Sequence, residues 1–250
     1  MRIAAWAALT LSLVWSAPSP AGPWRAVLDL EGATLAFGLD IQGAPGALRG
    51  RLCNGRRCEP WSTVSLQGDS LRLEIADYAA SITARLSGDS LTGTYRNVGN
   101  RGPRVIPFRA TRGRWPITPG PAALVGRWDA SFFSDFGTSP RVFEFRNGPQ
   151  GLEGTMISNT GDYGHFAGEV RGDSFALAHF DGSFVYLLAG ARHGDTLRGV
   201  FHAGLRTQTP WIADVTVLGE DPFEFPPEQF NQLPVDMVIV GGEVREMAKA

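Results

Sequence analysis

The sequence has little of the clustered positive charge that nucleic-acid-binding proteins carry. Charged residues make up 19% of its 250 residues, the formal net charge is −2, and no basic run stands out. We therefore expect no nucleic-acid partner, because phosphate backbones are bound by clustered Lys and Arg side chains. The sequence also lacks a Walker loop, a dinucleotide fingerprint and a nucleophile elbow. These absences favour a protein without catalysis of its own and without a cofactor.

Long apolar runs are absent after the first residues. The chain opens with Arg2, an apolar run from Ile3 to Trp15, and the small residues SAPSPAG. This order is typical of a secretory signal peptide, which we expect over 1–21 with cleavage after Ser19-Pro20-Ala21. An uncleaved anchor is the alternative, but the run is short for a membrane span. We expect a periplasmic or extracellular protein with no membrane span after cleavage.

An internal repeat organises the rest of the chain. Four landmarks recur at offsets of 104 to 106 residues: Gly22-Pro23-Trp24 with Gly126-Arg127-Trp128, Leu48-Arg49-Gly50 with Leu152-Glu153-Gly154, Gly68-Asp69-Ser70 with Gly172-Asp173-Ser174, and Gly88-Asp89-Ser90-Leu91 with Gly194-Asp195-Thr196-Leu197. The expected units are repeat 1 over 22–112, a linker over 113–122, repeat 2 over 123–219 and a Pro-rich C-terminal extension over 220–250.

Each repeat is expected to form about eight short antiparallel strands joined by tight turns. The expected strands are 23–30, 33–42, 47–53, 60–67, 70–77, 80–87, 90–97 and 103–111 in repeat 1, and 126–133, 140–147, 152–158, 164–171, 174–181, 184–193, 196–203 and 209–218 in repeat 2. The Gly-Asp-Ser and Gly-Asp-Thr triplets suit turns, and one carboxylate each is too few for calcium. Closing each meander into an up-and-down barrel removes exposed strand edges. The predicted fold is all-β, with two tandem barrel-like (lipocalin-like) repeats.

One hairpin of repeat 2, residues 174–190, is apolar on both faces. In repeat 1 the matching strands alternate, with Leu71, Leu73 and Ile75 facing in and Arg72 and Glu74 facing water. The same register in repeat 2 places Phe175, Leu177, His179, Phe184, Tyr186 and Leu188 inward. It places Ala176, Ala178, Phe180, Val185, Leu187 and Ala189 outward.

An apolar outer face of this kind is typical of an interface. Burying Phe180, Val185 and Leu187 would contribute roughly 4–8 kcal/mol at most. The surface that covers them could be repeat 1, the C-terminal extension or another chain, and we favour an intramolecular contact.

Cys53 and Cys58 are the only cysteines, in the stretch CNGRRC. Asn54-Gly55 favours a hairpin turn, so in an oxidising compartment the thiols are expected to form a disulfide across it. The alternative is a redox-active pair whose thiol pKa is lowered by Arg56 and Arg57. The spacing is not that of a Cys-x-x-Cys motif, and a structural bond is the favoured interpretation.

The histidines His165, His179, His193 and His202 all lie in repeat 2 without metal-ligand spacing. We expect no metal site, a buried His179 in a core position, and a solvated His193. The carboxylates of Glu153, Asp162, Glu169 and Asp181 are expected in solvated turn and strand positions. A buried polar site formed by His179, Asp162, Tyr163 and Asp181 is the remaining possibility.

Three pieces of repeat 2 resemble a known module. They are Thr160-Gly161-Asp162-Tyr163, Phe180-Asp181-Gly182-Ser183, and the later Gly194-Asp195-Thr196-Leu197 with Trp211. Over about 124–217 the chain resembles the β-rich region before the thioredoxin fold in periplasmic TlpA-like thiol–disulfide oxidoreductases. The resemblance implies a non-catalytic domain, since the redox chemistry of that family belongs to a Cys-x-x-Cys on the following thioredoxin fold. This chain has no cysteine after Cys58, so no catalytic residue carries over.

The sequence therefore predicts a non-catalytic secreted or periplasmic module that packs against or docks a thioredoxin-fold redox partner. The expected contact residues are Phe180, Val185 and Leu187. A lipocalin-like barrel that binds a small molecule is the alternative. A redox protein that uses Cys53 and Cys58 is a second alternative.

Overall fold

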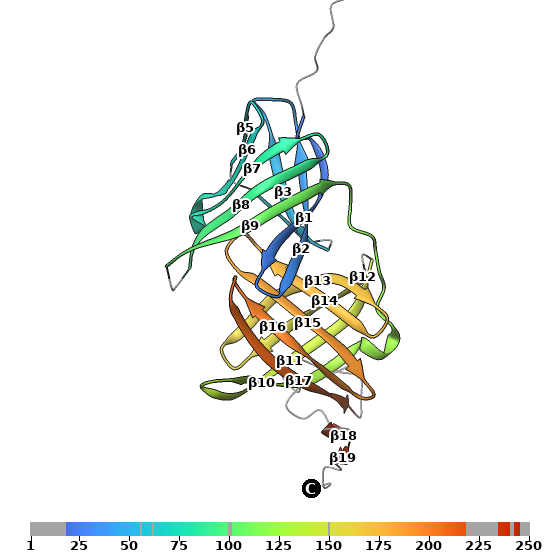
Figure 1. Cartoon of the computed structure of the whole chain (residues 1–250). Coiled ribbons are helices and arrows are strands. Elements are labelled where there is room, and N and C mark those ends of the chain that lie inside the picture. Colours follow the sequence, from blue (N-terminus) through green and yellow to red (C-terminus); the bar gives the residue numbers. More distant parts are fainter. Residues whose placement is uncertain are drawn as a thin grey trace, which may run out of the picture.

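The computed structural model describes residues 19–55, 57–61, 63–99, 102–149, 151–218, 235–240 and 243–245. Residues 1–18 of the signal peptide predicted over 1–21 therefore lie outside the described residues, and so do residues 219–234, 241–242 and 246–250 of the C-terminal region. The described chain is built from strands, with two short 3-10 helices and no α-helix. Its strands form one sheet per repeat, so the predicted all-β, two-repeat, barrel-like fold is confirmed (Figure 1).

Repeat 2 forms a closed barrel. Its strands are β10 (Gly126–Ser134), β11 (Gly137–Gly148), β12 (Gly151–Ser158), β13 (Gly161–Arg171), β14 (Ser174–Phe180), β15 (Val185–His193), β16 (Thr196–Ala203) and β17 (Thr207–Leu218). Each strand pairs antiparallel with the next, and β10 pairs with β17 to close the ring. Beyond the ring, β17 also pairs with β18 (Val235–Val240), which pairs with β19 (Glu243–Arg245).

Repeat 1 forms a curled nine-stranded sheet that does not close. Its strands are β1 (Gly22–Leu30), β2 (Ala33–Gln42), β3 (Arg49–Asn54), β4 (Arg57–Pro60), β5 (Thr63–Gln67), β6 (Ser70–Ile75), β7 (Ala80–Ser87), β8 (Ser90–Gly99) and β9 (Gly102–Arg112). The helix η1 (Ala76–Tyr78) follows β6, and η2 (Ala122–Leu124) precedes β10. The two ends of the sheet are β4 and β5.

The single strand predicted over 60–67 was wrong. This stretch turns at Trp61, so that β4 pairs with β3 whereas β5 pairs with β6. The Trp61 side chain is only 5% exposed, and its backbone N–H donates to Gly50 O at 2.9 Å. Burial of this indole and the missing N–H of Pro60 both favour a bend over a continuous ladder. The bend therefore separates the ladders of β4 and β5, the two edge strands of the sheet.

Four turns of the two repeats share one backbone conformation at their first glycine. Glycines Gly68, Gly88, Gly172 and Gly194 open the Gly-Asp-Ser and Gly-Asp-Thr triplets, and their φ angles lie between +56° and +65°. Residues other than glycine adopt this left-handed region at a cost. The repeated triplets are therefore tight turns between β5 and β6, β7 and β8, β13 and β14, and β15 and β16.

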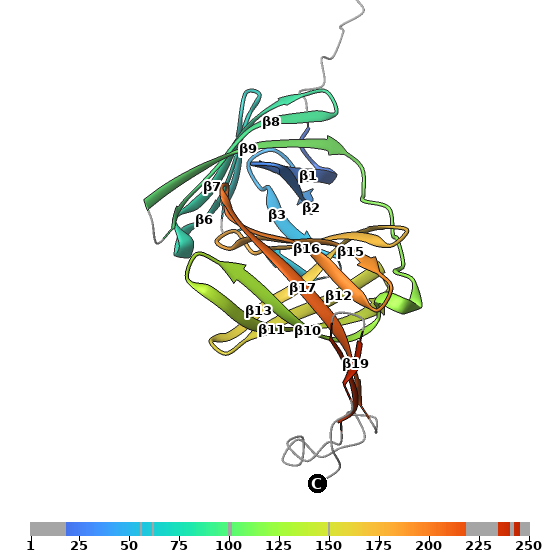
Figure 2. The ribbon, with the colours of Figure 1, turned by 60° about the horizontal axis from the view of Figure 1, so that its bottom comes forward.

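The β14–β15 hairpin of repeat 2 packs against β2 and β3 of repeat 1. We call residues 174–193 the junction hairpin. The side chains of Ala178, Phe180, Val185 and Leu187 belong to the same buried cluster as the core of repeat 1, whereas Phe175, Leu177 and Leu188 belong to the core of repeat 2. One face of the hairpin thus packs in the core of repeat 1 and the other face packs in the core of repeat 2. Figure 2 shows β15 on the side of the barrel that faces repeat 1.

Candidate functional site

Asn54 of repeat 1 holds the backbone of Phe180 in the junction hairpin. Its Nδ2 donates to Phe180 O at 2.7 Å, and Phe180 N donates to its Oδ1 at 3.1 Å. The amide side chain thus satisfies both backbone groups of Phe180, as a neighbouring strand would. Asn54 is 6% exposed, and the bonds join residues that are 126 positions apart. Buried polar groups that lack such partners are costly, so this pair specifies one arrangement of the two repeats.

The ring of Phe180 completes the aromatic core of repeat 1. It is 0% exposed and lies edge-on to Phe37 at 4.8 Å and to Tyr95 at 5.1 Å between ring centroids. Tyr95 Oη donates to Gly182 O at 2.9 Å, and Asn97 Nδ2 donates to Ser183 O at 2.9 Å. Burial raises the pKa of Tyr95, so its hydroxyl stays protonated and able to donate.

A second contact between the repeats joins the β1–β2 turn to the β16–β17 turn. Glu31 N donates to Leu205 O at 2.9 Å, and Gln208 Nε2 donates to Glu31 O at 2.8 Å. The ion pair between Arg206 and Glu31 is exposed, so we assign it little of the stability. Because the repeats touch at two separate places, their relative orientation is defined.

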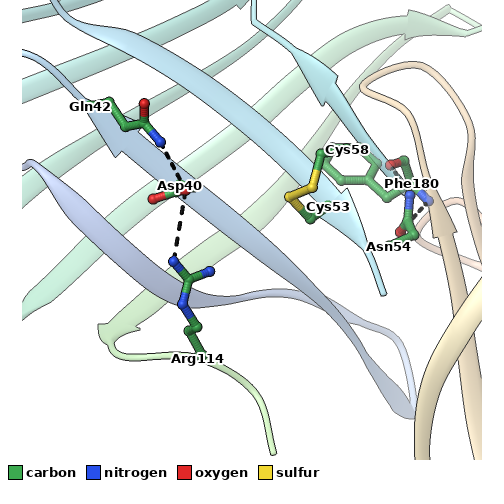
Figure 3. The surroundings of a disulfide bond; sticks show 7 residues. All are labelled: Asp40, Gln42, Cys53, Asn54, Cys58, Arg114 and Phe180. Atoms are coloured by element: carbon green, nitrogen blue, oxygen red, sulfur yellow. Dashed lines mark hydrogen bonds and ion pairs between the residues drawn. A yellow bond between two sulfur atoms is a disulfide. The ribbon is translucent and has the colours of Figure 1, made fainter. Parts of the chain in front are cut away.

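The Cys53–Cys58 disulfide is formed, which confirms the predicted pairing. It joins β3 to β4, and among the described strands β4 pairs only with β3. Along β3 the side chains alternate: Leu52 and Asn54 are buried inside, and Cys53 lies half-buried on the outer face. The disulfide therefore faces away from the core but is one residue from the Asn54–Phe180 pair. Figure 3 shows both.

A cavity of about 230 Å³ borders the disulfide at the junction of the repeats. We call it the junction groove. Its walls are the outer face of β2, the disulfide, the linker over 113–117 and residues 167–169 of β13. The linker is held against β2 because Trp115 Nε1 donates to Phe37 O at 2.7 Å. These elements come from both repeats, so the groove exists only while they stay docked.

The groove carries charged groups at its rim. Asp40 accepts a hydrogen bond from Gln42 at 3.2 Å, and Arg114 lies 3.9 Å from the same carboxylate (Figure 3). The Arg114 side chain is 74% exposed, and Ile117 beside it is 60% exposed. Arg114 can therefore reach an acidic group on a partner, and Ile117 offers an apolar contact.

Glu153 contradicts the expectation of a solvated carboxylate, because it is 2% exposed on β12. Arg146 Nε donates to Glu153 Oε1 at 3.1 Å, and His165 Nε2 lies 3.7 Å from Glu153 Oε2. Burial lowers the pKa of His165, and the nearby Glu153 opposes that shift. A Cβ on Gly55 would lie 4.0 Å from His165 Nε2, so this buried group sits beside the disulfide turn.

The residues suggested for a buried polar site are spread along the open end of the barrel. Asp162 is exposed and accepts from Thr155 Oγ1 and from Gly164 N. Asp181 accepts from the backbone N–H groups of Ser183 and Phe184, and so shapes the hairpin turn. An exposed Asp162 means that these residues do not form a buried site.

The other two members of that set, His179 and Tyr163, both pack against Tyr186. His179 is half-buried, and its Nδ1 lies 3.1 Å from His165 O. Phe184, expected inside, is 49% exposed and stacks on Tyr186. The end of the barrel is therefore an aromatic rim. Below it the interior is filled by side chains that include Phe143, Phe145, Phe166, Phe175 and Trp211.

The remaining predicted residues occupy separate positions. Ala176 and Ala189 are partly buried against the core of repeat 1, His193 is exposed, His202 is buried, and Glu169 pairs with Arg171. Among the described residues, no group of three or more His, Cys, Asp or Glu side chains could hold a metal ion. In the same part of the chain, no helix is long and apolar enough to cross a membrane.

Sequence reasoning missed Asn54 as an interface residue and read it only as part of a turn. The alternation along β3 places it on the inner face, where a polar side chain needs a buried partner. That pattern was a usable signal. Tyr95 and Arg114 carried no comparable signal, because their roles depend on contacts with segments distant in the sequence.

Comparisons with known proteins assign no family. No family model and no curated protein match the chain. A candidate outer membrane protein from Bacteroides fragilis is similar in structure over 78% of this chain and 97% of its own, with 13% identity and a TM-score of 0.29. A protein of unknown function from the DUF3598 family of Nostoc punctiforme covers 78% of this chain and 95% of its own, with 9% identity and a TM-score of 0.27. An agglutinin from Burkholderia oklahomensis covers 77% and 94%, with 10% identity and a TM-score of 0.21. Scores of this size assign neither a family nor a function to the chain.

Proposed function

We propose that the protein is a non-catalytic secreted or periplasmic module that docks a thioredoxin-fold thiol–disulfide oxidoreductase at the junction groove. The observation that carries this proposal is the position of the Cys53–Cys58 disulfide, half-buried in a wall of the groove. A partner seated in the groove would bring its own thiols next to this bond. The choice of partner rests on the resemblance of 124–217 to the module of TlpA-like oxidoreductases.

The docking surface differs from the one that the sequence suggested. Phe180 and Val185 are 0% exposed and Leu187 is 2% exposed, because repeat 1 covers them. These side chains stabilise the protein itself and are not available to a partner. The groove instead offers Ile117 as an apolar contact and Arg114 as a charge that can guide association.

The experiment is a calorimetric titration of the mature chain with the purified thioredoxin domain of a TlpA-like oxidoreductase, which measures the dissociation constant. Binding is expected, and Arg114→Glu should weaken it about tenfold, a typical effect for a charge at an interface. The matched control is Arg198→Glu, an exposed arginine on β16, three strands from β13 around the barrel. The proposal is wrong if the domain does not bind, or if the two variants weaken binding equally.

The small-molecule alternative has less structural support. Eight-stranded barrels are commonly just filled by their own side chains, as the interior of repeat 2 is. The junction groove measures about 230 Å³. That volume is below the roughly 300–1,000 Å³ of pockets that enclose a drug-sized ligand. A hollow of about 480 Å³ over β10 and β11 falls within that range, but it is lined by the outward-facing Asp129, Ser131 and Val142 and is not inside the barrel. A shallow contact with a protein surface suits this groove better.

A further inference from the structure

The disulfide and the Asn54–Phe180 pair occupy opposite faces of the same short strand. Cys53 faces the junction groove, and Asn54, the next residue, holds the junction hairpin. Beyond Asn54 the chain turns into β4, an edge strand of four residues whose one partner in the described part of the chain is β3. An edge strand of this length makes few backbone hydrogen bonds. The disulfide therefore contributes much of what keeps β4 paired with β3 in register.

We propose that the Cys53–Cys58 disulfide is a redox-sensitive control of the junction. While the bond is intact, it keeps the end of β3 in the conformation in which Asn54 pairs with Phe180. When the bond is reduced, the end of β3 and β4 are freed, the amide pairing weakens, and the junction hairpin exchanges between docked and undocked states. The aromatic contacts of Phe180 with Phe37 and Tyr95 would then be broken in the undocked state.

The reaction is thiol–disulfide exchange with a dithiol. A thiolate of the dithiol attacks one sulfur of the bond, forms a mixed disulfide and releases the other cysteine as a thiolate. The second thiolate of the dithiol then attacks the mixed disulfide and releases the remaining cysteine. Two electrons pass to this chain, and the dithiol leaves as a disulfide. Arg57, exposed beside Cys58, favours the departing thiolate.

This control does not depend on the proposed partner, since any dithiol that reaches the groove would operate it. It is therefore tested with a small reagent. The mature chain is compared before and after treatment with excess dithiothreitol under native conditions, and the released thiols are counted. Hydrogen exchange is followed by mass spectrometry on peptides that cover 180–187 and, as an internal reference, 171–174 at the opposite end of the barrel.

Reduction should release both thiols. It should also speed hydrogen exchange in 180–187 by about tenfold or more, because the loss of one hydrogen bond lowers the free energy of local opening by an amount that corresponds to about that factor. Exchange in 171–174 should not change. The variant Asn54→Ala should show the faster exchange in 180–187 while its disulfide is intact, and reduction should add little to it. Three outcomes would overturn the proposal: a disulfide that resists the reagent, unchanged exchange in 180–187 with both thiols free, and faster exchange throughout both repeats.

Discussion

Truncating Phe180 to alanine tests whether the junction hairpin completes the core of repeat 1. The ring is 0% exposed and lies between Phe37 and Tyr95, at 4.8 and 5.1 Å between centroids. Removing a buried phenylalanine ring costs about 3–5 kcal/mol, because apolar contacts are lost and a cavity remains. Whole domains are stable by only about 5–15 kcal/mol, so this loss is large. We expect Phe180→Ala to lower the free energy of unfolding by about 3–5 kcal/mol.

The assay is denaturant unfolding followed by circular dichroism and by tryptophan fluorescence. The matched control is Phe184→Ala, in the same hairpin but with a side chain that is 49% exposed. We expect that control to change the free energy of unfolding by less than about 1 kcal/mol. Equal effects of the two substitutions would refute the reasoning. They would mean that a ring buried against repeat 1 contributes no more to the free energy of unfolding than a half-exposed ring of the same hairpin.

Three further predictions concern the same junction. Asn54→Ala should lower the free energy of unfolding by about 1–3 kcal/mol in thermal or denaturant unfolding, because two buried backbone groups lose their partner. Gly182→Ala should lower the melting temperature clearly more than Gly172→Ala, because a Cβ at Gly182 would collide with a buried isoleucine side chain whereas one at Gly172 meets open space. The lowered pKa of His165 means that the unfolded chain binds more protons in acid. The free energy of unfolding should therefore fall as the pH drops below about 6.5, and His165→Asn should reduce that dependence in a pH series of denaturant titrations.

The repeat was the most informative part of the sequence for the fold. Comparison of the strand at 71–76 with the strand at 175–180 separated the inner from the outer face of the junction hairpin. The structure places Leu177 and Phe180 in different cores, as that comparison implies. Period-two alternation of burial survives in strands such as β6 and β7, which have one face on a core and one in water, so local pattern and tertiary burial agree there. In β14 and β15 both faces are covered, each by a different core.

The opening in repeat 1 could not be predicted in the same way. The pattern over 60–67 suits one strand, and the choice between partners β3 and β6 depends on the burial of Trp61. That burial is a tertiary effect. The solvated environment predicted for Glu153 was wrong for a similar reason, since its contacts with Arg146 and His165 depend on how β11 and β13 flank β12.

The candidate site was also predictable from the sequence only in part. The cysteine pair and its turn were predictable, because CNGRRC contains both thiols and the turn dipeptide within six residues. The groove was not, because it is formed where β2, the linker and β13 meet. Functional surfaces that lie between repeats depend on how the repeats dock, which a pattern along one strand does not specify.

A footprint of the partner on this chain tests the central claim most directly. Hydrogen exchange would be measured on the mature chain alone and with saturating thioredoxin domain of a TlpA-like oxidoreductase. Docking at the junction groove predicts slower exchange in 36–40, 53–58, 113–117 and 167–169, with no change at 143–147 on the opposite side of the β12 ladder. Protection at 143–147 without protection around the disulfide would contradict the account, and so would the absence of any protection.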